Sequence, residues 1–157
     1  MCIRDSELRV QKPRKGRGFF LSMNYLQCLV MPKLLLILAA ANGFIAVSLG
    51  AFGAHGLEQM LTEDSLDTFQ TGVEYHMYHS LALIGTAALA IQFPKEKLLR
   101  LSGFLFLLGI LFFSGSLYTL VLSEFRWLGA ITPIGGVFFL AAWASLLRCA
   151  FKLKVNP

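Results

Sequence analysis

The chain has 157 residues, of which 56% are hydrophobic and 15% are charged, and its mean hydropathy is +0.65. Soluble domains carry roughly 25% charged residues, so this composition excludes an ordinary water-soluble fold and indicates that lipid surrounds most of the chain. The net charge of +5 does not favour nucleic-acid binding, because residues 1–30 hold six basic and two acidic groups whereas residues 31–157 hold eight and seven.

Residues 1–30 differ in character from the rest of the chain. A basic, turn-rich patch at residues 12–18 precedes an apolar piece that is too short to cross a bilayer. No small-residue cleavage site follows, which disfavours a cleaved signal peptide, and Pro32 is expected to separate the piece from the next helix. The opening six residues look like translated adaptor sequence, and Met31 is a natural start. We therefore predict that residues 1–30 are disordered or artefactual and that residues 31–157 form one transmembrane domain.

The first predicted transmembrane helix covers residues 33–54. About 22 residues at ~1.5 Å each are long enough to cross the ~30 Å hydrocarbon core of a bilayer. Ala46, Gly50 and Ala54 recur every four positions and form a stripe on which other helices can pack closely. Asn42 is the only strongly polar side chain in the interior of this helix, and we expect it to form a hydrogen bond across a helix interface.

The second predicted helix begins in water and continues into the membrane. The segment from residue 56 to residue 74 holds five acidic residues and no Lys or Arg. Thr62 is expected to cap the helix, with Glu63 and Asp64 in its first turn, and the membrane-spanning part is expected at residues 75–93. At about 100° per residue, one face of this helix should point into the bundle. The members of that face are Phe69, Gly72, Val73, His76, Ser80, Leu83 and Ala87.

The third predicted span covers residues 101–122. Ser102, Gly109 and Ser116 repeat at seven-residue intervals, a seam of small residues that favours close, left-handed helix packing.

The fourth predicted span covers residues 133–151. Thr132 is expected to be the N-cap and Pro133 the first helical residue, with Gly135 and Gly136 near the start of the helix. Alternatively, the helix begins near Phe125 and bends at the proline.

The distribution of basic residues predicts the orientation in the membrane. From residue 31 on, seven Lys and Arg residues fall on one side of the four spans and only Arg126 falls on the other. By the positive-inside rule, both termini are expected in the cytoplasm and the acidic connection outside. The seven residues are Lys33, Lys95, Lys97, Arg100, Arg148, Lys152 and Lys154.

Four motifs carry a family resemblance. They occupy residues 50–55 (GAFGAH), 69–79 (FQTGVEYHMYH), 111–118 (LFFSGSLY) and 132–136 (TPIGG). In order and spacing they closely resemble the YgdD-like family of small bacterial inner-membrane proteins, over essentially all of the chain after residue 30. The resemblance implies a four-helix protein of the bacterial plasma membrane. It implies no catalytic residue, because the family carries a domain-of-unknown-function label.

The histidines are the candidate metal ligands. His55, His76 and His79 are expected near the outer membrane interface, and the latter two, three residues apart on a helix, could share a metal with His55 as a third ligand. The preferred interpretation is that they bond to other helices and to interfacial water, with no metal and no cofactor. Cys2, Cys28 and Cys149 show no CxxC spacing, which disfavours a thiol metal site or a disulfide framework.

The interiors of the four spans contain no Asp, Glu, Lys or Arg, the groups on which ion and proton pathways depend. Transport of a neutral solute along a polar seam is the alternative; the seam comprises Asn42, Ser80, Thr86, Ser102, Ser114 and Ser116. Ser114–Gly115 is similar to the GxSG motif of intramembrane serine proteases, but Phe112 stands where the first glycine belongs, so helix packing explains the pair better. Haem ligation is disfavoured because the third and fourth spans contain no histidine.

We therefore predict an all-α, non-enzymatic, integral membrane four-helix bundle. Its expected partners are membrane lipid and either a second copy of the chain or another membrane protein that it assists, with no nucleic acid. The alternative is a small-solute or metal-linked transport component that uses the outer histidines. The expected helix-packing residues are Asn42, Ala46, Gly50, Ala54, Gly72, Ser80, Ser102, Gly109, Ser114, Ser116, Gly135 and Gly136.

Overall fold

The computed structural model describes residues 17–123 and 125–153, with side chains from residue 30 on except that of residue 126. These residues form helices and connecting turns with no strand among them, which confirms the all-α class. The elements are α1 (Arg17–Phe52), the π-helical turn η2 (Gly53–Leu57), α2 (Glu63–Gln92), α3 (Lys97–Gly109), the π-helical turn η3 (Ile110–Ser114), α4 (Gly115–Ser123), the 3₁₀ turn η4 (Arg126–Ala130) and α5 (Thr132–Lys152). Because η3 joins α3 to α4 without a break, we call Lys97–Ser123 the third helix.

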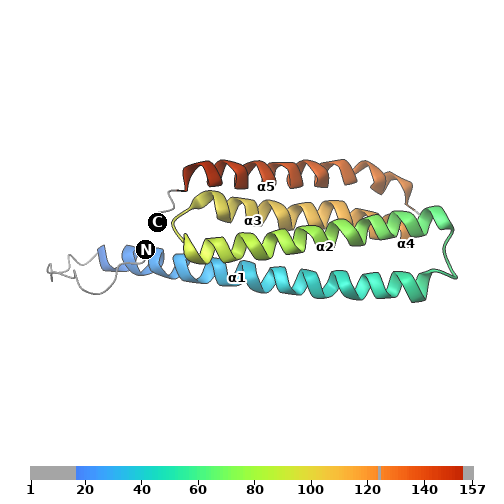
Figure 1. The fold of residues 1–157 in the computed structure, drawn as a ribbon, viewed down its shortest axis with the longest axis horizontal. Coiled ribbons are helices and arrows are strands. Elements are labelled where there is room, and N and C mark those ends of the chain that lie inside the picture. Colours follow the sequence, from blue (N-terminus) through green and yellow to red (C-terminus); the bar gives the residue numbers. More distant parts are fainter. Residues whose placement is uncertain (1–16, 124, 154–157) are drawn as a thin grey trace.

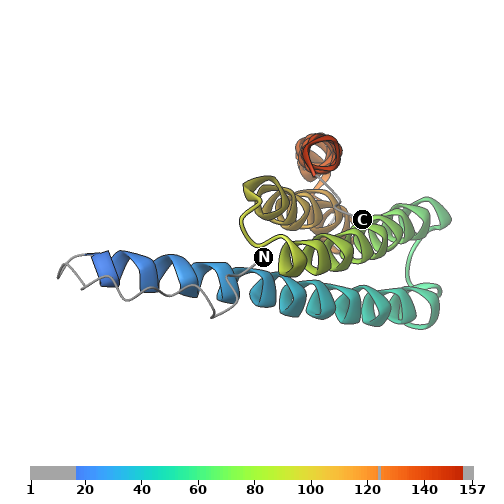
Figure 2. The same ribbon diagram turned by 60° about the vertical axis from the view of Figure 1, so that its left-hand side comes forward.

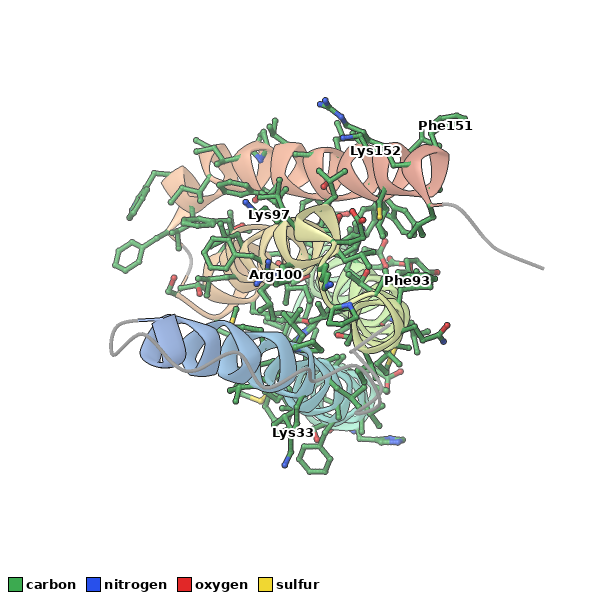
Figure 3. All side chains as sticks on the ribbon, turned by 90° about the vertical axis from the view of Figure 1, so that its left-hand side faces the viewer. Lys33, Phe93, Lys97, Arg100, Phe151 and Lys152 are labelled. Carbon is green, nitrogen blue, oxygen red and sulfur yellow. The ribbon has the colours of Figure 1, made fainter. Side chains whose placement is uncertain are left out.

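The helices run up and down side by side in an elongated bundle (Figures 1 and 2). Along the bundle α1 packs on α2, the third helix packs on the other side of α2, and α5 packs on the third helix. In the end-on view of Figure 3, Lys33, Lys97, Arg100 and Lys152 gather at one end of the bundle. The acidic connection between α1 and α2 lies at the opposite end. The topology is therefore antiparallel, with these four basic residues at one end and Arg126 in η4 at the other.

Three helical segments of the described chain are long and apolar enough to cross a membrane: Val30–Leu57, Lys97–Ser123 and Trp127–Lys152. The 30-residue helix α2 is not among them. Its central position explains the difference, since α2 buries Leu83 and Ala87 in a core shared with α1, the third helix and α5. A helix whose neighbours are mostly protein does not need a lipid-soluble surface all round.

The first helix departs from the expectation at its start. Pro32 lies inside α1, which is helical from Arg17 on. A proline removes only one backbone donor, and transmembrane helices tolerate that loss. The expected break at Pro32 is therefore wrong. That residues 1–30 are disordered or artefactual stays a prediction, and residues 1–16 lie outside the described residues.

The start of α2 agrees with the sequence. Thr62 is the N-cap, and its Oγ1 accepts a hydrogen bond of 3.4 Å from the backbone N–H of Ser65. All seven residues of the face expected to point inward are buried. α2 packs on the first span well before residue 75: a Cβ built on Gly53 would lie 3.0 Å from Phe69, and one on Gly50 would lie 3.2 Å from Val73. The contact between the two helices thus begins earlier than the expected second span.

The start of α5 differs from both sequence alternatives. Thr132 is the first helical residue, Ile131 is the N-cap, and no side chain caps the helix. The hydroxyl of Thr132 instead lies 2.8 Å from Ser116 Oγ on the third helix. The 3₁₀ turn η4 precedes α5, so the helix does not run on from Phe125. The threonine is not a cap because its hydroxyl is engaged by a neighbouring helix, a contact that local sequence does not encode.

Candidate functional site

Three polar side chains from three helices meet in a buried network. His76 of α2 is 4% exposed. Its Nε2 lies 3.1 Å from Asn42 Oδ1 on α1, and its Nδ1 lies 3.3 Å from the phenolic oxygen of Tyr118 on α4. Asn42 Nδ2 donates a hydrogen bond of 2.8 Å to the carbonyl oxygen of Leu38. This polar network, Asn42–His76–Tyr118, ties α1, α2 and the third helix together and includes the cross-helix bond expected of Asn42.

The contacts fix the direction of each hydrogen bond. Asn42 Nδ2 is the donor to Leu38, so Oδ1 faces the histidine as an acceptor and His76 Nε2 must carry the proton. In a neutral imidazole the other nitrogen is an acceptor. His76 Nδ1 therefore accepts the O–H of Tyr118. Both nitrogens of His76 are engaged within the protein, and the ring has no lone pair left for a metal.

A groove opens beside the polar network, between α1, α2 and the third helix. We call it the lateral groove. It has a volume of about 320 Å³ and is lined by Asn42, Ile45, Leu49, His76, Leu107, Ile110, Leu111, Gly115 and Tyr118. Ile45 and Leu111 are 46% and 63% exposed, so the groove opens to the side of the bundle. Its lining is apolar except for the polar network.

The second histidine of α2 belongs to an aromatic layer. His79 Nδ1 donates a hydrogen bond of 2.7 Å to the carbonyl oxygen of Tyr75. The imidazole stacks on Phe139 of α5 at 3.4 Å between ring centroids, and Tyr75 stacks on Phe113 at 4.5 Å. His79 therefore packs between helices.

The three histidines do not converge. His55 lies in η2 and is exposed, whereas His76 and His79 are buried and turned toward different neighbours. No three His, Cys, Asp or Glu side chains within the described ranges are placed to hold a metal ion. The hypothetical metal site of His55, His76 and His79 is thus not assembled.

Comparison with known proteins places the chain in a family. The family described as "Protein of unknown function (DUF423)" matches residues 49–136, which include His76 and Tyr118. The UPF0382 membrane protein YwdK of Bacillus subtilis is 46% identical over 120 residues, covering 76% of this chain and 98% of YwdK. The UPF0382 inner membrane protein YgdD of Escherichia coli K12 is 45% identical over 122 residues, covering 78% and 92%. The chain belongs to this family.

Membership of the DUF423 family confirms the resemblance drawn from the four motifs. The names of the relatives and the apolar helices also confirm a multi-pass protein of the bacterial inner membrane. No solved structure matches the chain.

Several expected packing residues of this DUF423 chain lie at helix contacts. Ala46 is buried, and a Cβ on Gly72 would lie 2.9 Å from the ring of Tyr118. A Cβ on Gly109 would overlap the ring of Phe139, and one on Gly135 would overlap the backbone of Phe113. These glycines allow helices to approach to distances that no larger residue permits.

The buried serines use their hydroxyls in two ways. Ser102 Oγ donates to the carbonyl oxygen of Ala142 on α5 at 3.1 Å, and Ser116 pairs with Thr132. Ser80 Oγ instead donates to the carbonyl oxygen of His76 in its own helix at 2.7 Å.

Two expected packing residues do not pack. Ala54 is exposed, whereas Gly53, seven residues after buried Ala46, is buried. A spacing of four residues drifts by about 40° per step around a helix, whereas a spacing of seven nearly returns to the same face. A Cβ on Gly136 would have nothing within 4 Å, since only Gly135 of this pair faces the third helix.

The sequence interpretation missed Tyr118, both π-helical turns and the aromatic layer. A single tyrosine within the apolar residues 101–122 was the available signal for Tyr118, since such a hydroxyl needs a partner in lipid. The π-helical turns at Gly53–Leu57 and Ile110–Ser114 left no comparable signal.

Proposed function

We propose that this protein is a four-span inner-membrane protein, with both ends of the chain in the cytoplasm, that acts without catalysis as a structural or accessory component of the membrane. The observation that carries the proposal is that five hydrogen bonds join polar groups of different helices among the described residues. The bonds are Asn42 with His76, His76 with Tyr118, Ser102 with Ala142, Ser116 with Thr132 and Ser145 with Leu98. In lipid such pairs hold helices together.

The position of α2 supports the fourth crossing. This helix lies between α1 and the third helix, and its contacts with α1 reach from Phe69 near one end to the core around Leu83 and Ala87. Because α1 and the third helix are both apolar enough to span, a helix packed between them over this length crosses the same hydrocarbon layer. The 45 Å that 30 residues provide at ~1.5 Å each exceeds the ~30 Å needed.

The charge distribution supports the orientation. Lys33, Lys97, Arg100 and Lys152 gather at one end of the bundle, whereas Glu58, Glu63 and Asp64 belong to the opposite end. The basic end is cytoplasmic under the positive-inside rule.

The surroundings of the reactive residue types support a non-enzymatic role. Ser114 Oγ is buried and has no hydrogen-bond partner among the described residues, so no base takes its proton as a serine nucleophile requires. Both nitrogens of His76 are engaged in the polar network. Ser80 and Thr86 bond to carbonyl groups of their own helix, and this does not favour the alternative of a polar transport seam.

The accessory role is tested by crosslinking in intact membranes. A photoreactive amino acid is placed at Phe44 on α1 or at Leu140 on α5, which are 76% and 72% exposed, and at buried Phe106 as a matched control. We expect a discrete protein adduct, either a second copy of the chain or one other membrane protein, from one exposed position and none from Phe106. Adducts with lipid alone from both exposed positions would contradict the role.

A further inference from the structure

The lateral groove has a lining that includes the three residues of the polar network. Its walls come from α1, α2 and the third helix, and its floor is the contact between His76 and its two partners. The volume of about 320 Å³ lies at the lower end of the roughly 300–1,000 Å³ range of ligand pockets. Ligand pockets are typically apolar with a few placed polar groups, which is the composition found here.

The polar network has hydrogen-bonding capacity that no described residue uses. Asn42 Nδ2 carries two N–H groups, of which Leu38 accepts one. Asn42 Oδ1 can accept a second hydrogen bond, and so can the phenolic oxygen of Tyr118, whose own proton goes to His76. Asn42 and Tyr118 are only half-buried and line the groove. One donor and two acceptors are therefore left over on side chains that line a space otherwise lined by hydrocarbon.

The lack of charged lining residues and the side opening of the groove restrict the kind of molecule that can bind in it. No charged side chain is among the residues that line the groove, so a charged headgroup would lose its water without gaining a counter-ion. The groove opens to the side of the bundle past Ile45 and Leu111, within two of the apolar spans. The occupant therefore enters from the hydrocarbon of the bilayer.

The helix geometry at the groove is also unusual. Ile110 and Leu111 belong to η3, and Gly115 follows it directly. Single π-helical turns are rare and frequently mark functional sites. A Cβ on Gly115 would meet only the carbonyl oxygen of Ile110, at 4.0 Å, so the glycine leaves the groove open without being required for helix packing.

We propose that the lateral groove binds an uncharged, membrane-dissolved molecule that has an apolar body and one terminal group able both to donate and to accept a hydrogen bond, for which a long-chain primary alcohol is the simplest chemistry. The hydroxyl accepts the free N–H of Asn42 and donates to the oxygen of Asn42 or Tyr118, while the chain lies along Leu107 and Leu111. This inference goes beyond the accessory role and does not depend on it.

The test compares two photoreactive probes on the purified full-length protein in phosphatidylcholine vesicles. One probe is a long-chain primary alcohol with a diazirine in its chain, and the other is the hydrocarbon of the same length with the same diazirine. We expect the alcohol to label peptides that contain Leu107 and Leu111 at least severalfold more than the hydrocarbon does, and unlabelled alcohol to compete. Equal labelling by the two probes would mean that the groove holds only acyl chains, and would overturn the proposal.

A matched pair of glycine variants locates the binding. Gly115→Leu fills the groove, whereas Gly136→Leu adds the same side chain to α5 where a Cβ has nothing within 4 Å. We expect Gly115→Leu to lower alcohol labelling about tenfold and Gly136→Leu to leave it unchanged. Unchanged labelling in a folded Gly115→Leu protein would refute the site.

A second variant keeps the test decisive if leucine at position 115 prevents folding. Tyr118→Phe keeps the ring that packs on Phe69 and removes one acceptor of the groove. The loss of one hydrogen bond should reduce alcohol labelling by about two- to tenfold and leave hydrocarbon labelling unchanged. An equal change for the two probes would contradict recognition of the hydroxyl.

Discussion

Gly135 and Gly136 offer the sharpest test of the packing, because two adjacent glycines have opposite surroundings. A Cβ on Gly135 would lie 2.7 Å from both Cα and Cβ of Phe113, and the backbone there cannot turn aside as a side chain can. Carbon atoms pack at about 3.5–4.0 Å, so Gly135→Ala must push α5 away from η3 by about 1 Å. A gap of that size costs roughly a quarter to a half of the dispersion energy of the contacts affected.

The expected cost of Gly135→Ala is about 2–3 kcal/mol in the free energy of unfolding, at the upper part of the ~1–3 kcal/mol range for overpacking. Gly136→Ala adds a methyl group in open space, so it should be neutral or stabilising by up to about 1 kcal/mol through helix propensity. The assay is reversible unfolding of the protein in mixed micelles, followed by helical circular dichroism while the fraction of denaturing detergent is raised. Equal effects of the two substitutions would refute the close approach of α5 to the third helix.

Three other substitutions test separate parts of the fold with the same assay. Asn42→Leu leaves the Nε2–H of buried His76 without an acceptor and should cost about 1–3 kcal/mol. Ser102→Ala removes the hydrogen bond to the carbonyl of Ala142 on α5, and should cost about 0.5–1.5 kcal/mol. Thr62→Ala removes the N-cap of α2 and should lower the free energy of unfolding by about 0.5–2 kcal/mol, as N-cap substitutions by alanine do in other proteins.

A shared control separates cross-helix bonds from bonds within one helix. Ser48 is exposed, and its hydroxyl bonds only to the carbonyl of Phe44 in its own helix. Ser48→Ala should therefore change stability by less than about 0.5 kcal/mol. If Ser102→Ala or Asn42→Leu changed stability no more than this control does, the cross-helix bonds would not hold the bundle together.

The sequence was most informative where a property depends on the helix alone. The inward face of α2 follows from the 3.6-residue period, and the cap at Thr62 follows from a threonine placed before two acidic residues. Asn42 needed a partner because lipid offers none, and this predicted a cross-helix bond without saying which helix supplies it.

The features that the sequence did not reveal depend on how two helices meet. Gly53 is buried and Ala54 is exposed because α2 packs against the face of the first span that holds Gly53. Residues spaced four apart move off that face by about 40° per step. Thr132 has the residue type of a cap, but its hydroxyl forms a hydrogen bond with Ser116 of the third helix. The burial of His79 depends on its stacking on Phe139 of α5. Each of these outcomes requires the relative positions of two helices, which periodicity in one of them does not fix.

Cysteine accessibility before and after α2 tests most directly whether this helix crosses the membrane between the other spans. In a chain without its native cysteines, Met60→Cys lies in the connection before α2 and Lys95→Cys in the connection after it, and both positions are exposed. An impermeant maleimide added to spheroplasts should label Met60→Cys alone, and should label Lys95→Cys only in inverted vesicles. Labelling of both cysteines from the same side of the membrane would contradict the four-span bundle.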